Sequence, residues 1–198
     1  MFHDGSRTLQ DRFDTRRVAD RIDELLVKDT IGESDREFIQ RSDMFFLATA
    51  DEHGHPNCSY KGGDPGFVHV LDEQTIAFPN YDGNGMYLSL GNLRLNPHVG
   101  LLFIDFYAAP PRRLRLNGIA HVEPEDPLLA RYPGAQFIVR VRAHQLFPNC
   151  PRYIHRMQRV ERSEYVPREG CETPVPDWKR TEWASDVLPA GDPARAEG

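Results

Sequence analysis

The sequence predicts an α+β protein: an antiparallel barrel or sandwich of about six to eight strands with flanking helices. Three observations predict this class. Short apolar or alternating segments recur between residues 45 and 146, and most are separated by tight turns. Helical periodicity is clearest near the N-terminus and in one central segment. The 198 residues are enough for one domain with a sizeable core.

Two helices are predicted before the first strand. Asp14 or Thr15 can cap the first, because apolar residues recur at helical spacing from there to about Val27. A second, short helix is predicted from Ser34, where Ser34 and Glu37 have the spacing of a capping box.

The strands are predicted from apolar runs, from period-two alternation and from the Gly, Asn, Asp and Pro residues between them. The first two should form a hairpin around the turn at residues 51–56. The predicted strands cover residues 45–50, 57–61, 67–71, 75–78, 99–106, 112–122 and 136–146.

The most informative stretch connects two of these strands. A turn at residues 82–85 (Asp-Gly-Asn-Gly) leads into a helix predicted over residues 86–95. A tight turn that leads into a helix leaves unpaired N–H groups, which is a natural anion site. Asn84, Gly85 and Met86 are therefore predicted to hold a phosphate-bearing ligand. An ordinary glycine-rich turn with an Asn cap is the alternative interpretation.

The C-terminal part is predicted to be irregular. A short helix or loop is expected over residues 124–133, and Asn149 could cap a last helix over residues 151–159. The proline-containing remainder is expected to form an extended arm and a frayed tail. The predicted divisions are an N-terminal helical segment (1–33), the barrel domain (34–165) and the arm and tail (166–198).

Composition excludes several classes. The net charge of −6 argues against nucleic acid as the main partner. No run of about 18 apolar residues exists, so no membrane span is expected. The N-terminus lacks the apolar core of a secretory signal, and three widely spaced cysteines do not suggest a disulfide framework. A reducing cytoplasm is the expected location.

Two cations are candidate anion ligands. Ser59 and Lys61 are two residues apart on a strand and share a face, a pairing that suits an oxyanion. A solvated lysine at a strand end is the alternative interpretation. Arg115 lies in the middle of a predicted strand. If its side chain faces the barrel interior, it needs an anionic partner; if it faces solvent, it indicates no site.

Other candidates are weaker. Cys150 and Tyr153 could flank a ligand, although a small buried thiol is the favoured interpretation of Cys150. His53, His55 and Cys58 resemble a metal ligand set only superficially, and no metal is predicted. Trp178 and Trp183 lie on a polar arm, so docking onto a cofactor or a partner subunit is favoured for them.

Four segments of the chain form a recognisable pattern: FFLATADEHGHPNCSYKGGDPGFVHVLDEQTIAFPNYDGNGM, then NLRLNPHVGLLFID, LRLNGIAHV and FPNCPRYIHRM. On these segments, from about residue 35 to residue 159, the chain resembles the pyridoxamine 5′-phosphate oxidase-like, FMN-binding split-barrel family. The resemblance implies a split β-barrel and a homodimer with the flavin in a groove between subunits.

The resemblance also implies roles for particular residues. It places Ser59, Tyr60 and Lys61 beside the ribityl phosphate and the ring edge, and Asn84, Gly85 and Met86 at the phosphate-binding turn. Better-known members carry Arg or Lys at that turn, whereas this chain has Gly and Met. The phosphate charge would then be met by other cations, such as Lys61 or Arg115. A deazaflavin or haem ligand remains an alternative.

The function expected from these features is that of an FMN-binding flavoprotein, an oxidoreductase that moves hydride or electrons to or from a small-molecule substrate. No catalytic acid or base is identified. The alternatives are a non-catalytic flavin, haem or deazaflavin binding module, and a dimeric interaction protein with an empty groove. The residues predicted to contact the cofactor are Ser59, Tyr60, Lys61, Asn84, Gly85, Met86, Arg115, Cys150, Tyr153 and Trp178.

Overall fold

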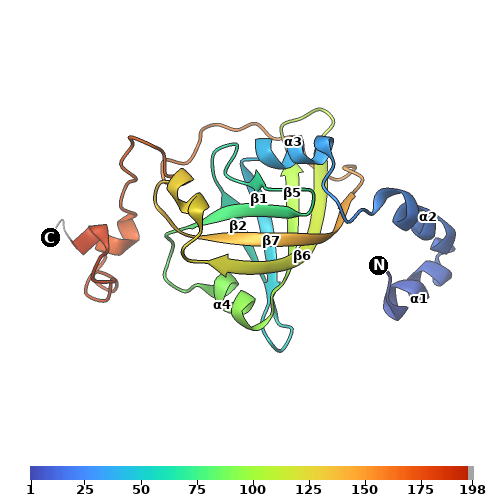
Figure 1. Ribbon diagram of the computed structural model, residues 1–198, viewed down its shortest axis with the longest axis horizontal. Coiled ribbons are helices and arrows are strands. Elements are labelled where there is room, and N and C mark those ends of the chain that lie inside the picture. The colour runs from blue at the N-terminus through green and yellow to red at the C-terminus, as the bar shows by residue number, and fades with distance from the viewer. Residues whose placement is uncertain (196–198) are drawn as a thin grey trace. The chain divides into compact units, whose positions relative to one another are not determined.

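A computed structural model describes residues 1–195 of the chain. Within them, a seven-stranded antiparallel sheet and four α-helices form an α+β fold, which confirms the predicted class (Figure 1). The sheet order is β2-β1-β5-β6-β7-β4-β3. The strands are β1 (Met44–Ala50), β2 (Pro56–Gly62), β3 (His69–Val70), β4 (Thr75–Tyr81), β5 (His98–Asp105), β6 (Arg112–Glu123) and β7 (Ala135–Pro148).

Two of the helices lie at opposite ends of the barrel, α3 at one end and α4 at the other (Figure 1). The N-terminal helices α1 and α2 bury none of their residues. A 3-10 turn, η1 (Pro127–Arg131), connects β6 and β7, where a short helix or loop was predicted. The helices are α1 (Asp4–Arg12), α2 (Arg16–Leu26), α3 (Glu33–Arg41) and α4 (Leu88–Leu95).

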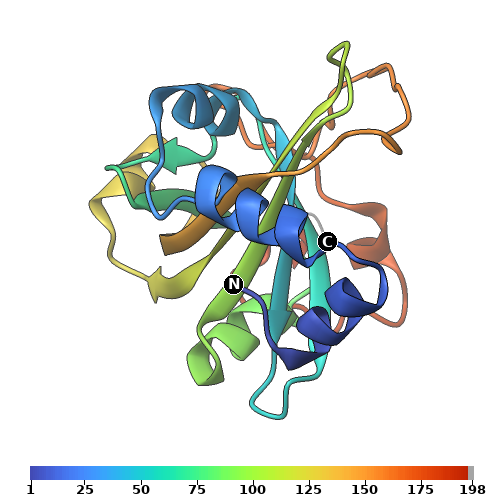
Figure 2. The same cartoon turned by 90° about the vertical axis from the view of Figure 1, so that its right-hand side faces the viewer.

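The sheet curls on itself without closing (Figure 2). Its two end strands are β2 and β3, and within residues 1–195 these two strands are not paired with each other. A curled sheet with two free edges is a split barrel, the architecture that the family resemblance implies. The gap between β2 and the β3–β4 edge is called the seam below.

The interior of the barrel is apolar because side chains alternate along the strands. On β6, Leu114, Leu116 and Ala120 are buried. Three phenylalanines from different strands meet beside them, with the ring of Phe45 4.9 Å from that of Phe78 and 5.2 Å from that of Phe103. Burying each such ring stabilises the fold by roughly 1.5–3 kcal/mol.

The structure corrects three local predictions. No helix forms over residues 151–159, and the side-chain oxygen of Asn149 caps nothing, since it is buried without a hydrogen-bond partner. Helix α1 was not predicted at all. The capping box at Ser34 is also wrong, because α3 begins one residue earlier behind Gly32 and has no side-chain cap.

The segment at 151–159 is held by contacts with distant residues instead of helical hydrogen bonds. The Met157 N–H donates to the Phe106 carbonyl, and Arg159 pairs with Asp43 and lies over the ring of Tyr107, 4.6 Å from its centroid. These contacts hold the segment that follows β7 against the barrel in an extended conformation.

The chain divides into two compact units, residues 1–160 and the segment from Glu161 onward. In the second unit, Trp178 and Trp183 stack with their centroids 5.8 Å apart, and Lys179 forms a 2.7 Å ion pair with Asp192. Within the predicted arm, short 3-10 turns form at Asp177–Arg180 and Pro193–Arg195. The last three residues of the predicted tail lie outside the described residues.

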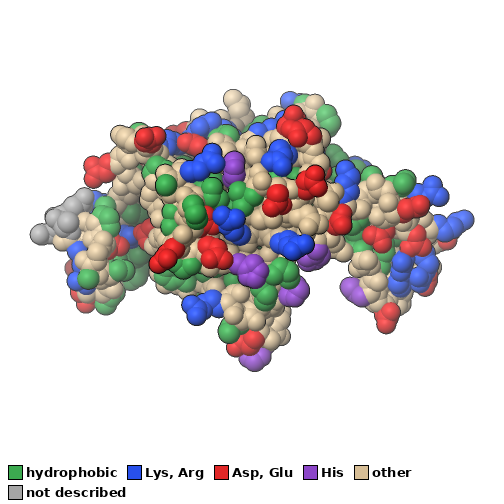
Figure 3. All heavy atoms as spheres, in the orientation of Figure 1, with side chains coloured by type: hydrophobic (Ala, Val, Ile, Leu, Met, Phe, Trp, Pro, Cys, Tyr) green, Lys and Arg blue, Asp and Glu red, His purple; other side chains and the backbone are tan. Residues whose placement is uncertain are grey.

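Charges of both signs are interspersed on the face of the molecule seen in Figure 3. None of the helices in residues 1–195 is both long enough and apolar enough to cross a membrane.

Candidate functional site

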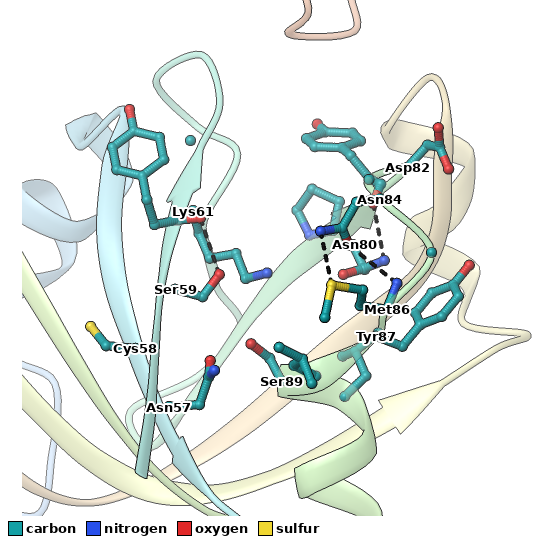
Figure 4. Close-up of a pocket in the computed structure, with 18 of the residues that line it drawn as sticks. Asn57, Cys58, Ser59, Lys61, Asn80, Asp82, Asn84, Met86, Tyr87 and Ser89 are labelled. Atoms are coloured by element: carbon teal, nitrogen blue, oxygen red, sulfur yellow. Dashed lines mark hydrogen bonds between the residues drawn. The ribbon is translucent and has the colours of Figure 1, made fainter. Parts of the chain in front are cut away.

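A cavity of about 460 Å³ lies at the seam of the barrel (Figure 4). One wall is β2 and the other is the chain from Pro79 at the end of β4 to Leu90 in α4. Its volume lies in the roughly 300–1,000 Å³ range of sites for small molecules and cofactors. The cavity therefore lies beside the edge of β2 that is not paired with another strand among the described residues.

The β2 wall presents Asn57, Ser59 and Lys61 to the cavity. These residues pair in register with inward-facing residues of β1, Lys61 with Phe45 and Ser59 with Leu47, so their side chains lie on the interior face. Because faces alternate, Tyr60 points to the outer face and is 62% exposed, although it still borders the cavity.

Lys61 is a half-buried cation without a partner. Its side chain extends from β2 into the cavity, toward the opposite wall (Figure 4). Among residues 1–195, none forms a hydrogen bond or an ion pair with its ammonium group. Burial lowers the pKa of the Lys61 ammonium below its usual range, and burial is the sole cause of this shift. An anion in the cavity would restore the favourable environment that the charge has lost.

The opposite wall contains the turn that the sequence singled out. Asn84, Gly85 and Met86 line the same cavity as Ser59 and Lys61. The amide of Met86 is not free, however, because its N–H donates to Oδ1 of Asn84 at 3.1 Å. The predicted picture of a phosphate resting on the Met86 amide therefore needs correction.

The free amides lie slightly further along the chain. Helix α4 begins at Leu88, two residues later than predicted, behind Tyr87 in the left-handed conformation (φ +48°). It has no side-chain cap, so the N–H groups of its first three residues, Leu88, Ser89 and Leu90, are unpaired among the described residues. All three residues line the cavity.

Ser89 is the site residue that sequence reasoning missed. It is only 7% exposed, yet its hydroxyl has no hydrogen-bond partner among the described residues. In Figure 4 this hydroxyl points into the cavity. The signal that could have found it was a serine in the first turn of the helix, but the predicted start at Met86 placed Ser89 two residues too deep in the helix.

Besides Lys61, the ionisable side chains that line the cavity include Asp82 and three tyrosines. Burial raises the pKa of Tyr81 to about 12, with smaller contributions from Tyr132 and Asp64. Burial, and then the negative charge of Asp43, also raises the pKa of Tyr60. No histidine is among the described residues that line the cavity. Over residues 1–195, no group of three or more His, Cys, Asp or Glu side chains is arranged to hold a metal ion.

Four predicted contact residues do not line this cavity: Arg115, Cys150, Tyr153 and Trp178. Arg115 lies on the outer face of β6 and is exposed, which settles the direction that the sequence left open. Cys150 is exposed rather than buried, so the favoured interpretation of it as a buried thiol is wrong. Tyr153 is 85% exposed, and Trp178 belongs to the second unit.

The fold and the cavity define the chain as an open antiparallel split barrel with an unpaired lysine and the N-terminus of a helix facing each other across its seam. The family model described as pyridoxamine 5′-phosphate oxidase matches residues 31–160 of the 198. The chain therefore belongs to the pyridoxamine 5′-phosphate oxidase-like, FMN-binding split-barrel family, as its sequence suggested.

Several solved structures are similar to the chain at low identity. They include HupZ from Group A Streptococcus (17% identity, 60% of this chain and 93% of that chain, TM-score 0.47) and an FMN-binding protein from Syntrophomonas wolfei (12%, 72% and 97%, TM-score 0.47). A third is HutZ, a haem storage protein from Vibrio cholerae (20%, 60% and 94%, TM-score 0.43). No curated protein matches the chain. At these scores the structural likenesses do not decide the ligand.

Proposed function

We propose that this chain binds FMN in the seam cavity and acts as an FMN-dependent oxidoreductase that transfers hydride or electrons to or from a small molecule. The observation that carries the proposal is Lys61, a half-buried ammonium without a partner among the described residues, in a cavity whose other wall is the N-terminus of a helix. A phosphate is the anion that such an arrangement binds best, because it accepts hydrogen bonds from amides and pairs with a cation.

The residues of the cavity divide into two roles. The amides of Leu88 to Leu90 and the Ser89 hydroxyl would donate to the phosphate, while Lys61 would neutralise it or stabilise negative charge at the ring edge. When bound, FMN supplies the hydride and electron chemistry. Ser59, Tyr60, Asn84, Gly85 and Met86 would contact the remainder of the cofactor.

A homodimer forms part of the proposal, as the family suggests. Arg115, Cys150, Tyr153 and Trp178 remain proposed contacts of a ligand held between two copies of the chain. Their positions outside the cavity of a single copy fit contributions made across a subunit interface.

A non-catalytic binding module is the second candidate. The observation that favours it is that burial raises the pKa values of Tyr60 and Tyr81, two hydroxyls at the cavity, away from neutrality. Turnover with a nicotinamide donor would favour the oxidoreductase, and tight binding without turnover would favour the module. A Soret band in the purified protein would indicate haem instead.

The test compares FMN with riboflavin, which lacks the phosphate. We expect the purified protein to bind FMN more tightly than riboflavin, as measured by quenching of flavin fluorescence. Lys61→Ala should weaken FMN binding about tenfold, because a charge-assisted contact to a phosphate contributes roughly 1.5–3 kcal/mol. Lys28→Ala is the matched control, since Lys28 is exposed and does not line the cavity.

Two results would contradict the proposal. A wild-type protein that binds neither flavin would exclude the flavoprotein function. Equal FMN affinity in wild type and Lys61→Ala would exclude the role of the lysine.

A further inference from the structure

The turn that forms one wall of the cavity has little internal support. Residues 82–86 are exposed, with Gly85 at φ +74°, and the following Tyr87 adopts a left-handed conformation that is uncommon for a tyrosine. Such a conformation persists only where surrounding contacts hold it in place. The contacts that hold the turn therefore also determine where α4 begins.

One side chain from another strand contacts the turn at three points. Oε1 of Gln136 accepts hydrogen bonds from Nδ2 of Asn80 at 3.0 Å and from the hydroxyl of Tyr87 at 3.3 Å. Its Nε2 donates to Asp82 at 3.4 Å. Gln136 thus connects the beginning, the middle and the end of the turn to β7.

The backbone explains why Gln136 is available for this contact. The register between β4 and β7 shifts between Asn80 and Tyr81, where Asn80 pairs with Phe137 and Tyr81 with Ala135. Gln136 is the additional residue of this β-bulge, and bulges redirect side chains. The ring of the next residue, Phe137, packs 6.2 Å from that of Tyr87 and supports the same end of the turn.

We infer that Gln136 is a positioning residue for the phosphate end of the cofactor, an inference that rests on the proposed FMN function. Gln136 does not line the cavity, whereas its partners Asn80, Asp82 and Tyr87 do. By fixing Tyr87, it fixes the position of the first turn of α4, whose amides and Ser89 face Lys61. Loss of Gln136 would leave these donors present but misaligned.

The experiment measures the preference of the full chain for FMN over riboflavin, because this ratio isolates the phosphate contacts. We expect Gln136→Ala to lower the preference about tenfold, because the hydrogen bonds from Asn80 and Tyr87 to Gln136 are lost. Thermal unfolding should remain cooperative. Gln145→Ala is the matched control: Gln145 is a glutamine on the same strand that accepts a 3.1 Å hydrogen bond from Asn117, away from the cavity.

A double-mutant cycle distinguishes positioning from general loosening of the fold. Tyr87→Phe should lower the preference in the wild type and have no further effect in Gln136→Ala, because the hydrogen bond between them is already lost. Additive effects would overturn the inference. If Gln136→Ala does not fold, the longer Gln136→Met is used with the same expectations.

The possible failures are distinguishable. A wild-type protein without affinity for either flavin overturns the proposed function, and the inference with it. If the wild type prefers FMN, two results overturn the positioning role alone. One is a Gln136→Ala variant that keeps the full preference, and the other is a Gln145→Ala control that loses as much preference as Gln136→Ala.

Discussion

Ser89 has two properties that seldom occur together in a stable fold. The residue as a whole is buried, and its hydroxyl, which opens onto the cavity, has no hydrogen-bond partner among the described residues. A hydroxyl that faces a cavity without a partner in the fold is available to donate to a ligand. Lys61 has the corresponding property on the opposite wall, since its charge is half-buried and no described residue acts as its counter-ion.

Ser89→Ala therefore should affect stability and binding in opposite directions. Removing a hydroxyl that has no partner within the fold should leave the free energy of unfolding unchanged or raise it by up to about 1 kcal/mol. The same change should weaken FMN binding about fivefold, through the loss of one donor to the phosphate. Denaturant unfolding and fluorescence titration measure the two effects.

Ser42→Ala is the control with the opposite expectation. The Ser42 hydroxyl donates to the Phe38 carbonyl at 2.8 Å at the end of α3, far along the chain from the cavity residues. Its removal should destabilise the fold and leave FMN affinity unchanged. A Ser89→Ala variant that loses stability without losing affinity would show that the hydroxyl serves the fold.

At the scale of elements, β7 contains a second bulge at His144, and the residue opposite it on β6 is Gly118. The register between β6 and β7 shifts between Asn117 and Gly118, and a Cβ on Gly118 would lie 2.5 Å from the backbone oxygen of Arg142. A backbone atom cannot move away as the end of a side chain can. The strand must therefore open locally to accept any other residue.

Gly118→Ala should accordingly lower the free energy of unfolding by about 1–3 kcal/mol, the usual effect of overpacking. Gly91→Ala in α4 is the matched substitution, because a Cβ there meets no atom within 4 Å. It should stabilise the protein by roughly 0.5–1 kcal/mol through the better helix propensity of alanine. Equal effects of the two substitutions in urea unfolding would contradict this interpretation of the bulge.

The elements that the sequence predicted well are those whose signal is local. The hairpin of β1 and β2 was placed within one residue at each end, because its apolar run, turn and returning strand are adjacent in the chain. Strands β5 to β7 were also found, since period-two alternation is clear where one face is buried. Ser59, Lys61 and Asn84 to Met86 line one cavity, as the family resemblance implied, and their contact with a cofactor stays a prediction.

The elements that the sequence predicted poorly depend on contacts between distant residues. Helix α4 begins at Leu88, behind a left-handed Tyr87 whose hydroxyl donates to Gln136, about fifty residues away. The predicted strand 67–71 shortened to His69–Val70, since only these two residues find partners on β4. The helix predicted over residues 151–159 is absent, and the side chain of Arg159 contacts Asp43 and Tyr107 instead. None of these partners can be inferred from the sequence near the element.

At the scale of the whole molecule, the family match and the first compact unit end at the same place. The match covers residues 31–160 and the unit covers residues 1–160. All the residues that line the seam cavity and all seven strands lie within this range. The second unit has interactions of its own, including the buried ion pair between Lys179 and Asp192.

A chain that ends at Val160 should therefore fold cooperatively and bind FMN. Any loss of affinity relative to the full chain would measure the contribution of the second unit, including Trp178.

A chain that ends at Pro148 should be less stable than the 1–160 chain by about 1–3 kcal/mol, because it leaves the partly buried Asp43 without Arg159. Urea unfolding of the two truncated chains and the full chain, with and without FMN, measures these differences. If the 1–160 chain is unfolded while the full chain is folded, the barrel depends on its C-terminal unit and the division into independent units is wrong.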